Sequence, residues 1–221
     1  MQLQLTWVGH SGLRIEHNGF VMVIDPGLLS AADAADGADA LLISHEHLDH
    51  YDTTKIASAI AARPGLPIWT NKSVAALLDQ SGAGAGADVH VIGDGDAFEV
   101  GGITVQAHGE WHAPIHPDIP RVRNTGFMID NRIFHPGDAL TDPGTRIELL
   151  LVPLHGFYTR SGPLVDYIRH LKPGQVAPIH DATLNAIGQG GVDAFLAENP
   201  PPGPGTGAPY SRPQAGTPID F

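Results

Sequence analysis

The segment 44–52 carries more chemical information than any other part of this chain. It reads Ser-His-Glu-His-Leu-Asp-His-Tyr-Asp and directly follows a short apolar run. In extended chain, side chains two positions apart point the same way, so His45 and His47 can share one ion. If the chain then turns into a helix, Asp49 and His50 project differently and can serve a second ion. Imidazole nitrogen and carboxylate oxygen suit Zn²⁺ and also Mn²⁺ or Fe²⁺, so the segment predicts a metal site rather than a histidine-rich polar loop.

Further candidate ligands follow other runs that we predict as strands. Asp138 and His180 each come just after such a run, and the segment His108-Gly-Glu-Trp-His112-Ala-Pro-Ile-His116 offers three more histidines. A lone Asp or His at a strand end is more often a cap or a structural hydrogen-bonding group. Here all the candidates share the same position, at the carboxyl end of a strand, where loops gather at one rim of a sheet sandwich. We therefore expect them near the metal segment, with His108, His112 and His116 as alternatives for one ligand.

Length and composition set the outer bounds. A chain of 221 residues can bury one substantial core, and its content of 42% hydrophobic and 16% charged residues is ordinary for a globular protein. The chain opens with alternating residues rather than a basic segment and an apolar run, and nothing approaches 18 consecutive apolar residues. We expect no signal peptide and no transmembrane segment. The lack of cysteine fits a cytoplasmic protein and removes thiolate ligands, disulfides and cysteine nucleophiles.

The formal charge of −12 disfavours a nucleic-acid partner. Binding a phosphate backbone needs clustered Lys and Arg, and the 12 basic residues here are scattered. We expect a small-molecule or lipid-like substrate instead. Such a substrate would meet apolar residues near the predicted rim, which are equally compatible with packing roles: Leu28, Leu29, Trp111, Ile115, Ile119 and Phe157.

The order of predicted elements indicates an α/β fold with two sheets packed face to face and helices outside, because a succession of strands followed by helices occurs twice. The expected strands are 3–8, 13–17, 20–24, 41–43, 88–92, 97–100, 103–107, 126–129, 132–135, 147–152 and 175–179. The run 41–43 is fully apolar and should be buried on both faces. The expected helices are 53–62, 73–80, 161–171 and a stretch reaching about 198 with a break near 188–191.

The Pro- and Gly-rich composition after residue 198 predicts a boundary. We expect one metallo-hydrolase domain over 1–198 and a C-terminal segment over 199–221. Within that segment, 200–208 are expected to be flexible, and 217–221 could close the fold with a short strand because Ile219 and Phe221 alternate.

The assembled pattern resembles the five-motif signature of the metallo-β-lactamase-fold hydrolases over nearly the whole chain. It comprises His45-x-His47-x-Asp49-His50, His112, Asp138 and His180. The opening Trp-Val-Gly-His-Ser-Gly and the later Ile24-Asp25-Pro26 resemble the branch containing ascorbate-6-phosphate lactonases, N-acyl-phosphatidylethanolamine phospholipases and many small bacterial hydrolases. The resemblance implies a four-layer αββα sandwich of two mixed sheets packed face to face.

The same resemblance implies a role for each residue. Metal 1 would be held by His45, His47 and His112, metal 2 by Asp49, His50 and His180, with Asp138 bridging the two. His10 and Asp25 are better supports than ligands, because a metal-bound imidazole needs a partner on its other nitrogen. His155 follows an apolar strand and could line the pocket as a catalytic residue.

The activity implied is that of a dinuclear metal-dependent hydrolase, with Zn²⁺ as the expected ion and Mn²⁺ or Fe²⁺ as alternatives. A metal-bridged hydroxide would cleave an ester, lactone or phosphodiester bond, and Asp49 would orient the water and shuttle a proton. The alternative is a metal-binding scaffold or regulatory protein on the same fold without turnover. A ligand-type residue is present at each of the seven positions, which favours catalysis.

Overall fold

The computed structural model describes residues 2–198 and 205–221, which form two β-sheets flanked by helices. The first sheet has seven strands in the order β13-β1-β2-β3-β4-β5-β6. They are β1 (Gln4–Gly9), β2 (Gly12–His17), β3 (Phe20–Ile24), β4 (Ala40–Ile43), β5 (Pro67–Thr70), β6 (Asp88–Val91) and β13 (Ile219–Asp220). The strands β1 to β3 form an antiparallel meander, and β3 to β6 run parallel, so the sheet is mixed.

The second sheet has six strands in the order β12-β11-β10-β9-β8-β7. They are β7 (Ala97–Val100), β8 (Ile103–His108), β9 (Gly126–Ile129), β10 (Ile133–His135), β11 (Leu149–Pro153) and β12 (Gln175–Ile179). Antiparallel pairs join β7 to β10, and parallel pairs join β10 to β12. Parallel neighbours end at the same edge, so the loops that leave β10, β11 and β12 emerge together.

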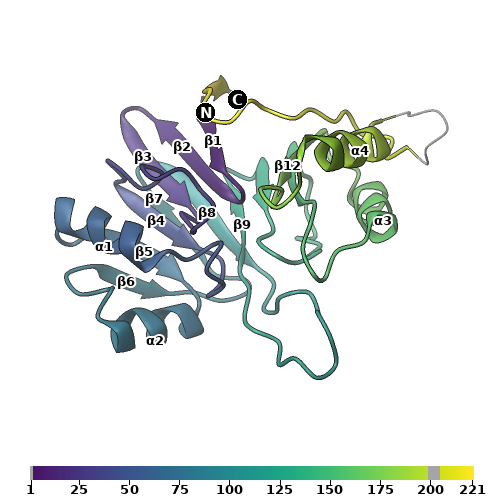
Figure 1. The fold of residues 1–221 in the computed structure, drawn as a ribbon. Coiled ribbons are helices and arrows are strands. Elements are labelled where there is room, and N and C mark those ends of the chain that lie inside the picture. The colour runs from purple at the N-terminus through teal and green to yellow at the C-terminus, as the bar shows by residue number, and fades with distance from the viewer. Residues whose placement is uncertain (1, 199–204) are drawn as a thin grey trace.

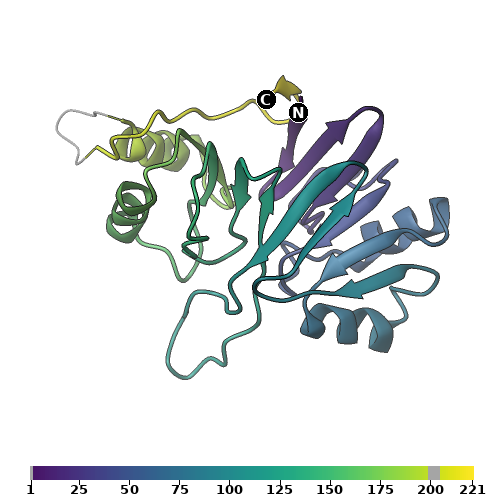
Figure 2. The same ribbon diagram turned by 180° about the vertical axis from the view of Figure 1, so that it is seen from behind.

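Four helices form the outer layers (Figures 1 and 2). The helices α1 (Thr53–Ala62) and α2 (Lys72–Ser81) pack on the first sheet, and α3 (Ser161–Leu171) and α4 (Ala186–Leu196) pack on the second. This is the predicted αββα sandwich. Within the described ranges, no helix has the length and apolar character needed to cross a lipid bilayer.

Strand alternation distributes the apolar side chains among three cores. In β4, Leu42 packs between the two sheets, whereas Leu41 and Ile43 pack under α1 and α2. In β11, Leu151 faces the space between the sheets and Leu150 faces α3. Because both faces of these central strands are covered, their sequences are continuously apolar, and the predicted burial of 41–43 on both faces is confirmed.

The structure differs from the sequence prediction in two elements. The strand β5 was not predicted, because its four residues begin with proline and show no clear alternation; it forms because β4 and β6 pair with it on either side. The predicted break near 188–191 is wrong, since α4 runs unbroken through these glycines. Asn185 caps its first turn and buried Leu196 anchors its last, which offsets the weak helix propensity of glycine.

The described part of the C-terminal segment packs against α4 and β12 where it begins and joins the first sheet at its end. The Thr206 hydroxyl donates to the Leu196 carbonyl at 3.0 Å and Ala208 is buried, so the expected flexibility is wrong for 205–208; the part of that expectation that falls on 200–204 lies outside the described residues. At its end, β13 pairs antiparallel with β1, with Ile219 opposite Leu5. The two ends of the described chain therefore lie side by side in the first sheet (Figure 1).

Candidate metal centre

Loops that follow strands bring all the predicted site residues to one edge of the sandwich. The residues and the strands they follow are His10 after β1, Asp25 after β3, His45 to His50 after β4, His112 after β8, Asp138 after β10 and His180 after β12. The candidate ligands therefore lie at the carboxyl ends of strands, and His155, the remaining predicted site residue, follows β11. Functional side chains collect at such an edge because the rigid sheets hold the loops in place.

The first group of candidate ligands consists of His45, His47, His112 and Asp138, whose ligand atoms lie within 4.8 Å of one another. His45 Nε2 lies 3.1 Å from His47 Nδ1, and His112 Nε2 lies 3.4 Å from Asp138 Oδ2. Three of the four are buried, and His47 is half-buried. Four nitrogen and oxygen donors at this mutual distance can surround a single ion.

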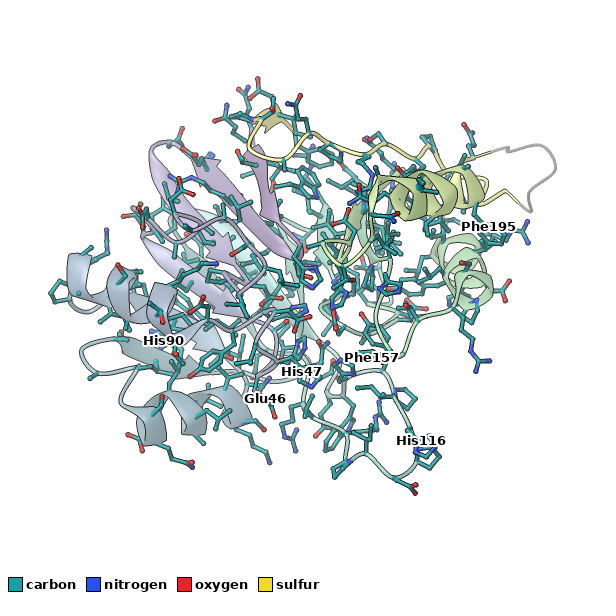
Figure 3. All side chains as sticks on the ribbon, viewed as in Figure 1. Glu46, His47, His90, His116, Phe157 and Phe195 are labelled. Carbon is teal, nitrogen blue, oxygen red and sulfur yellow. The ribbon has the colours of Figure 1, made fainter. Side chains whose placement is uncertain are left out.

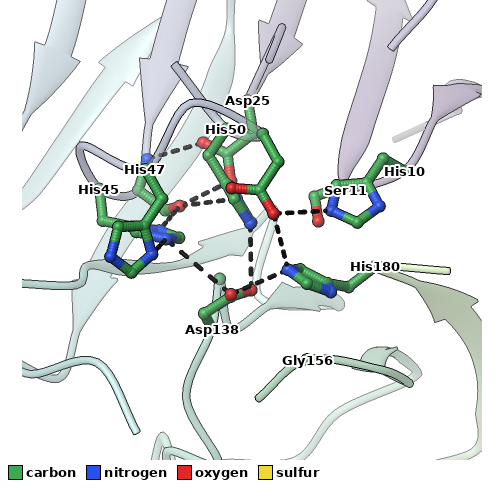
Figure 4. Close-up of polar contacts among 12 residues, drawn as sticks. His10, Ser11, Asp25, His45, His47, His50, Asp138, Gly156 and His180 are labelled. Carbon is green, nitrogen blue, oxygen red and sulfur yellow. Dashed lines mark hydrogen bonds and ion pairs between the residues drawn. The ribbon is translucent and has the colours of Figure 1, made fainter. Parts of the chain in front are cut away.

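The second group consists of His10, Asp49, His50 and His180, again within 4.8 Å of one another. Asp138 contacts this group as well, because its Oδ1 lies 3.1 Å from His50 Nε2 and its Oδ2 lies 2.9 Å from His180 Nε2 (Figure 4). The Asp138 carboxylate therefore lies between the two groups.

A buried hydrogen-bond network fixes two of the imidazoles from behind. His50 Nδ1 donates to Asp25 Oδ2 at 2.7 Å, and the Ser44 hydroxyl donates to the same oxygen at 2.6 Å. With its own proton committed, Ser44 Oγ can accept from His45 Nδ1, 3.0 Å away. In their neutral forms, both rings then direct the Nε2 lone pair into the centre.

Backbone carbonyls fix two more imidazoles in the same way. His112 Nδ1 donates to the Ala113 carbonyl at 2.5 Å, and His180 Nδ1 donates to the His155 carbonyl. The Nε2 atoms again face inward. Four of the five predicted histidine ligands thus have their outer nitrogen committed to a fixed acceptor, as metal-binding histidines require.

His10 has a different arrangement from the other histidines in its group. Its Nδ1 accepts the backbone N–H of Ala182 at 3.3 Å, so the neutral ring carries its proton on Nε2. That nitrogen donates to Asp49 Oδ2 at 3.1 Å. This pattern directs a donor rather than a lone pair toward the centre, so His10 positions the Asp49 carboxylate and is not free to bind an ion.

Three site residues have strained backbones. His10, Asp25 and His180 have φ angles of 52°, 47° and 57°, in the left-handed region that non-glycine residues rarely occupy. Such conformations cost on the order of 1 kcal/mol or more each, and they persist where the surrounding structure enforces them. All three directly follow a strand, so the strain turns each side chain from the sheet edge toward the centre.

The charges at the site shift several pKa values in the absence of a metal. Burial lowers the pKa of His180, but the Asp138 and Asp49 carboxylates outweigh it and raise the pKa to about 9. Burial would also raise the pKa of Asp49, but hydrogen bonds from His10 and His180 outweigh it and lower that pKa. Asp138 has a strongly lowered pKa because the charges of His50 and His180 outweigh its burial. Both carboxylates therefore stay ionised.

The residues present fit a divalent metal. The buried Nε2 atoms of His50, His112 and His180 face the Asp138 carboxylate at 2.9–3.4 Å, and none of them makes a hydrogen bond of good geometry with the described residues. Without an ion, these buried donors and acceptors have only one another as partners. A set of imidazole and carboxylate donors matches Zn²⁺, Mn²⁺ and Fe²⁺, and coordination would satisfy these atoms together.

The other histidines considered from the sequence lie outside both groups. His108 is half-buried against Phe134, and exposed His116 accepts the Asp118 N–H while lying far out on its loop from His47 (Figure 3). His155 is exposed, and its Nδ1 lies 3.0 Å from Thr183 Oγ1. Of the three alternatives within 108–116, the structure brings only His112 into a candidate ligand group.

A cavity of about 430 Å³ opens over both groups. It is lined by His47, Asp49, His112, Ile115, Asp138, His155, Gly156, Phe157, Tyr158, His180 and Thr183. Of the predicted rim residues, Ile115 and Phe157 line this cavity, and Ile119 lines a smaller adjoining cavity with His47 and His112. Leu28, Leu29 and Trp111 are exposed and line neither cavity, and Trp111 packs against Arg123.

Two contributors to the site were not identified from the sequence. Asn124 is buried, its Oδ1 accepts the Asp138 N–H at 2.9 Å, and its Nδ2 donates to the Pro136 carbonyl. It therefore holds the loop that presents Asp138, but in the sequence it resembles any turn asparagine. Tyr158 lines the cavity with its ring 4.9 Å from that of His112. Its signal was its place in a loop directly after an apolar strand.

An αββα sandwich with a His- and Asp-rich centre at one edge is the architecture of the metallo-β-lactamase fold. Residues 4–180 match the family model described as the beta-lactamase superfamily domain. The Mycobacterium tuberculosis protein Rv0786c is 34% identical over 188 residues, covering 82% of this chain and 85% of that protein. The chain therefore belongs to the metallo-β-lactamase-fold superfamily of metal-dependent hydrolases.

Two further comparisons agree with this assignment. The UPF0173 metal-dependent hydrolase MJ1163 of Methanocaldococcus jannaschii is 25% identical over 199 residues, covering 83% of this chain and 86% of that protein. The solved structure of Igni18, a metallo hydrolase from Ignicoccus hospitalis, superposes with a TM-score of 0.70 at 19% identity. The superposition covers 100% of this chain and 99% of Igni18, so it supports the fold over the full length.

Proposed function

We propose that this protein is a dinuclear metal-dependent hydrolase that cleaves an ester, lactone or phosphodiester bond in a small or lipid-like substrate. The observation that carries the proposal is the position of Asp138, whose carboxylate contacts both groups of inward-facing ligand atoms at the base of an open cavity. The proposed assignments are His45, His47 and His112 for metal 1 and Asp49, His50 and His180 for metal 2, with Asp138 shared. Divalent ions held there, most suitably Zn²⁺, would act as Lewis acids toward the oxygen under attack and lower the pKa of water.

The chain's own residues would then orient the reacting groups. Asp25, Ser44 and the backbone carbonyls hold the imidazoles in the required tautomers. His10 donates to Asp49 Oδ2, while Oδ1 has no hydrogen-bond partner among the described residues and Asp49 lines the cavity. Asp49 can therefore orient a water molecule through Oδ1. Its low pKa suits it to orient and relay a proton rather than to retain one.

His155 is the second residue that we propose to contact substrate. Its imidazole is exposed at the cavity, and its Nδ1 is engaged with Thr183. The Nε2 atom is left to meet a substrate group at the mouth. His155 belongs to neither candidate ligand group, which favours a role in substrate contact over metal binding.

The shape of the centre favours catalysis over a metal-binding scaffold. Structural metal sites are closed by protein ligands on all sides, whereas catalytic sites keep a position open. Here the Asp49 side chain keeps 30% of its surface exposed, and the cavity reaches both ligand groups. A scaffold without turnover has no need for that opening.

Metal analysis followed by a substrate panel tests the proposal. The protein is expressed with added zinc or manganese, its bound metals are quantified, and turnover is measured on esters, lactones and phosphodiesters. About two bound equivalents per chain and turnover that is lost with a chelator and restored by metal are expected. Bound metal without turnover on any of the three substrate classes would favour the alternative, a metal-binding scaffold. Absence of bound transition metal would remove the proposal altogether.

A further inference from the structure

The Tyr158 hydroxyl has an unusual environment beside the candidate metal centre. It is buried and makes no hydrogen bond of good geometry with the described residues, although burial and the nearby Asp138 carboxylate together raise its pKa well above the usual value. Buried tyrosine hydroxyls normally find a partner, because leaving one unpaired is costly. Tyr158 also lines the cavity over both ligand groups. A hydroxyl with these properties is available to a molecule that enters the cavity.

The ring of Tyr158 is held between the two ligand groups. It makes edge contacts with the rings of His112, at 4.9 Å and 77°, and of His180, at 5.9 Å and 75°. His112 belongs to the first group, and His180 lies in the second. The ring therefore contacts both groups, and beyond the effect of burial the Asp138 and Asp49 carboxylates raise the pKa of its hydroxyl, so the hydroxyl is near both of these carboxylates.

A tight turn with a required glycine fixes this placement. Two hydrogen bonds close this turn. The Thr159 N–H donates to the Gly156 carbonyl at 3.1 Å, and the Gly156 N–H donates to Thr159 Oγ1 at 2.8 Å. A Cβ atom at Gly156 would come within 2.6 Å of the Tyr158 ring. The absence of a side chain at position 156 is therefore what allows the ring to lie where it does.

The rest of the cavity favours an uncharged substrate with an apolar body. Among its lining residues, all of which are described, there is no lysine or arginine, although Arg121 lines a smaller adjoining cavity that shares His47, His112 and Ile115. Ile115 and Phe157 supply apolar surface, and Phe157 is 94% exposed. An anionic phosphodiester would have only the metal ions, and no lysine or arginine of this cavity, to balance its charge. A carboxylic ester or lactone needs no such balance.

We propose that Tyr158 Oη donates a hydrogen bond to the carbonyl oxygen of an uncharged carboxylic ester or lactone substrate. The inference rests on the proposed hydrolase function and names its substrate class. A phenol is a hydrogen-bond donor at neutral pH, and one aimed at the oxygen on which charge develops stabilises the transition state more than the ground state.

The reaction balances with water as the only co-substrate. A water oxygen adds to the carbonyl carbon, and the π electron pair moves onto the carbonyl oxygen, where Tyr158 Oη meets the growing negative charge. The carbon–oxygen double bond then re-forms and the bond to the leaving oxygen breaks. The proton lost by the attacking water is relayed by Asp49 to the leaving oxygen. The products are a carboxylate, with release of its proton, and an alcohol; a lactone gives a hydroxy acid.

The test compares three variants of the full chain loaded with zinc. Tyr158→Phe removes the hydroxyl and keeps the ring, and Gly156→Ala displaces the ring. Tyr51→Phe is the matched control, because the Tyr51 hydroxyl is also buried without a hydrogen-bond partner among the described residues, but packs under α1 and α2 outside the cavity lining. The substrates are p-nitrophenyl butyrate, δ-decalactone and bis(p-nitrophenyl) phosphate. Metal content is measured for every variant, and binding of butylphosphonate, a tetrahedral anion, is measured by calorimetry.

We expect the parent to cleave the ester or the lactone and to leave the phosphodiester largely intact. Tyr158→Phe should lower kcat by about 100- to 1000-fold with little change in KM, the range found for loss of one oxyanion donor. It should also weaken butylphosphonate binding at unchanged metal content. Gly156→Ala should shift kcat in the same direction, and Tyr51→Phe should match the parent.

Two results would overturn the inference while leaving the proposed function standing: preferential cleavage of the phosphodiester, or unchanged kcat and butylphosphonate affinity in Tyr158→Phe. Loss of metal in Tyr158→Phe with unchanged turnover per bound ion would assign the hydroxyl to the metal centre instead. If the parent cleaves none of the panel, the proposed function fails, and the butylphosphonate comparison still reports whether Tyr158 binds an oxyanion.

Discussion

Asp25 Oδ2 accepts the Nδ1–H of His50 at 2.7 Å, and both side chains are fully buried. The two residues follow neighbouring parallel strands, β3 and β4, whose carboxyl ends meet at the site. Asp25 also accepts from the Ser44 backbone N–H at 2.7 Å, so it ties the start of the metal segment to the ring of one predicted ligand. A carboxylate in this position fixes the ring orientation and raises the basicity of the ligating nitrogen.

The first prediction concerns the hydrogen bond by which Asp25 supports His50. Asp25→Asn keeps the shape of the side chain but replaces one carboxylate oxygen by an amide nitrogen, which cannot accept a hydrogen bond. We therefore expect metal affinity to fall by about 10- to 100-fold. Competition with a chromogenic chelator measures the change. Exposed Asp36 provides a control, since Asp36→Asn should bind metal as the parent does. Parent-like affinity in Asp25→Asn would show that the Asp25–His50 hydrogen bond does not support the centre.

The second prediction distinguishes the role of the Asp49 carboxylate from that of the Asp138 carboxylate. Asp49→Ala should abolish turnover while most of the fold and metal 1 remain, because the three proposed ligands of metal 1 do not include Asp49. Asp138→Ala should lose more metal, since Asp138 contacts His112, His50 and His180 across both groups. Both variants are compared with the parent by their metal content and by kcat on any substrate that the parent cleaves. Near-parent turnover in Asp49→Ala would remove this residue from the mechanism.

The third prediction is that metal binding releases protons near neutral pH. The Asp138 carboxylate raises the pKa of His50 despite its burial, and the pKa of His180 is about 9, so both rings carry a proton in the metal-free protein. Ligation requires neutral imidazole, so the protons must leave and affinity should rise with pH up to about 9. Metal titration in lightly buffered solution with a pH indicator counts the protons. No release at neutral pH would contradict the prediction.

The same shifts set the stability of the metal-free protein. A histidine whose folded pKa is raised stabilises the fold fully below its unfolded pKa of about 6.5 and loses that contribution as pH rises through the folded value. The metal-free protein should therefore lose stability between about 6.5 and the folded His180 value of about 9. His45 has a lowered pKa, mainly because of burial, and so is neutral in both states over this window. Thermal melts with and without metal should diverge as pH rises.

The fourth prediction concerns the close approach of two loops. A Cβ atom at Gly27 would lie 1.8 Å from the Asp49 backbone oxygen, so Gly27→Ala must displace either the loop after β3 or the metal segment. We expect loss of metal affinity together with a lower melting temperature. Gly162→Ala is the matched control, because position 162 lies in α3 with open space around its Cβ. Alanine there should be neutral or stabilising by up to about 1 kcal/mol. Parent-like metal binding in Gly27→Ala would show that the loops can separate.

The sequence alone determined the part of the site that is local. The spacing of His45, His47, Asp49 and His50 fixes which side chains share a direction, because they lie in one short segment after a strand. The fully apolar run 41–43 predicted a strand covered on both faces for the same local reason. The positions of Asp138 and His180 at strand ends could also be predicted, since parallel strands deliver their following loops to a common edge.

Only the tertiary structure decided the rest, because it depends on partners far away in the sequence. His112 was selected over His108 and His116 by backbone bonds from His112 to Val122 and from Ala113 to Asp138, which fix the path of the loop. The role of His10 depends on the Ala182 N–H, 172 residues away, which sets the tautomer of its ring. No spacing rule encodes such contacts. They arise when two sheets pack and bring the ends of β1 and β12 together.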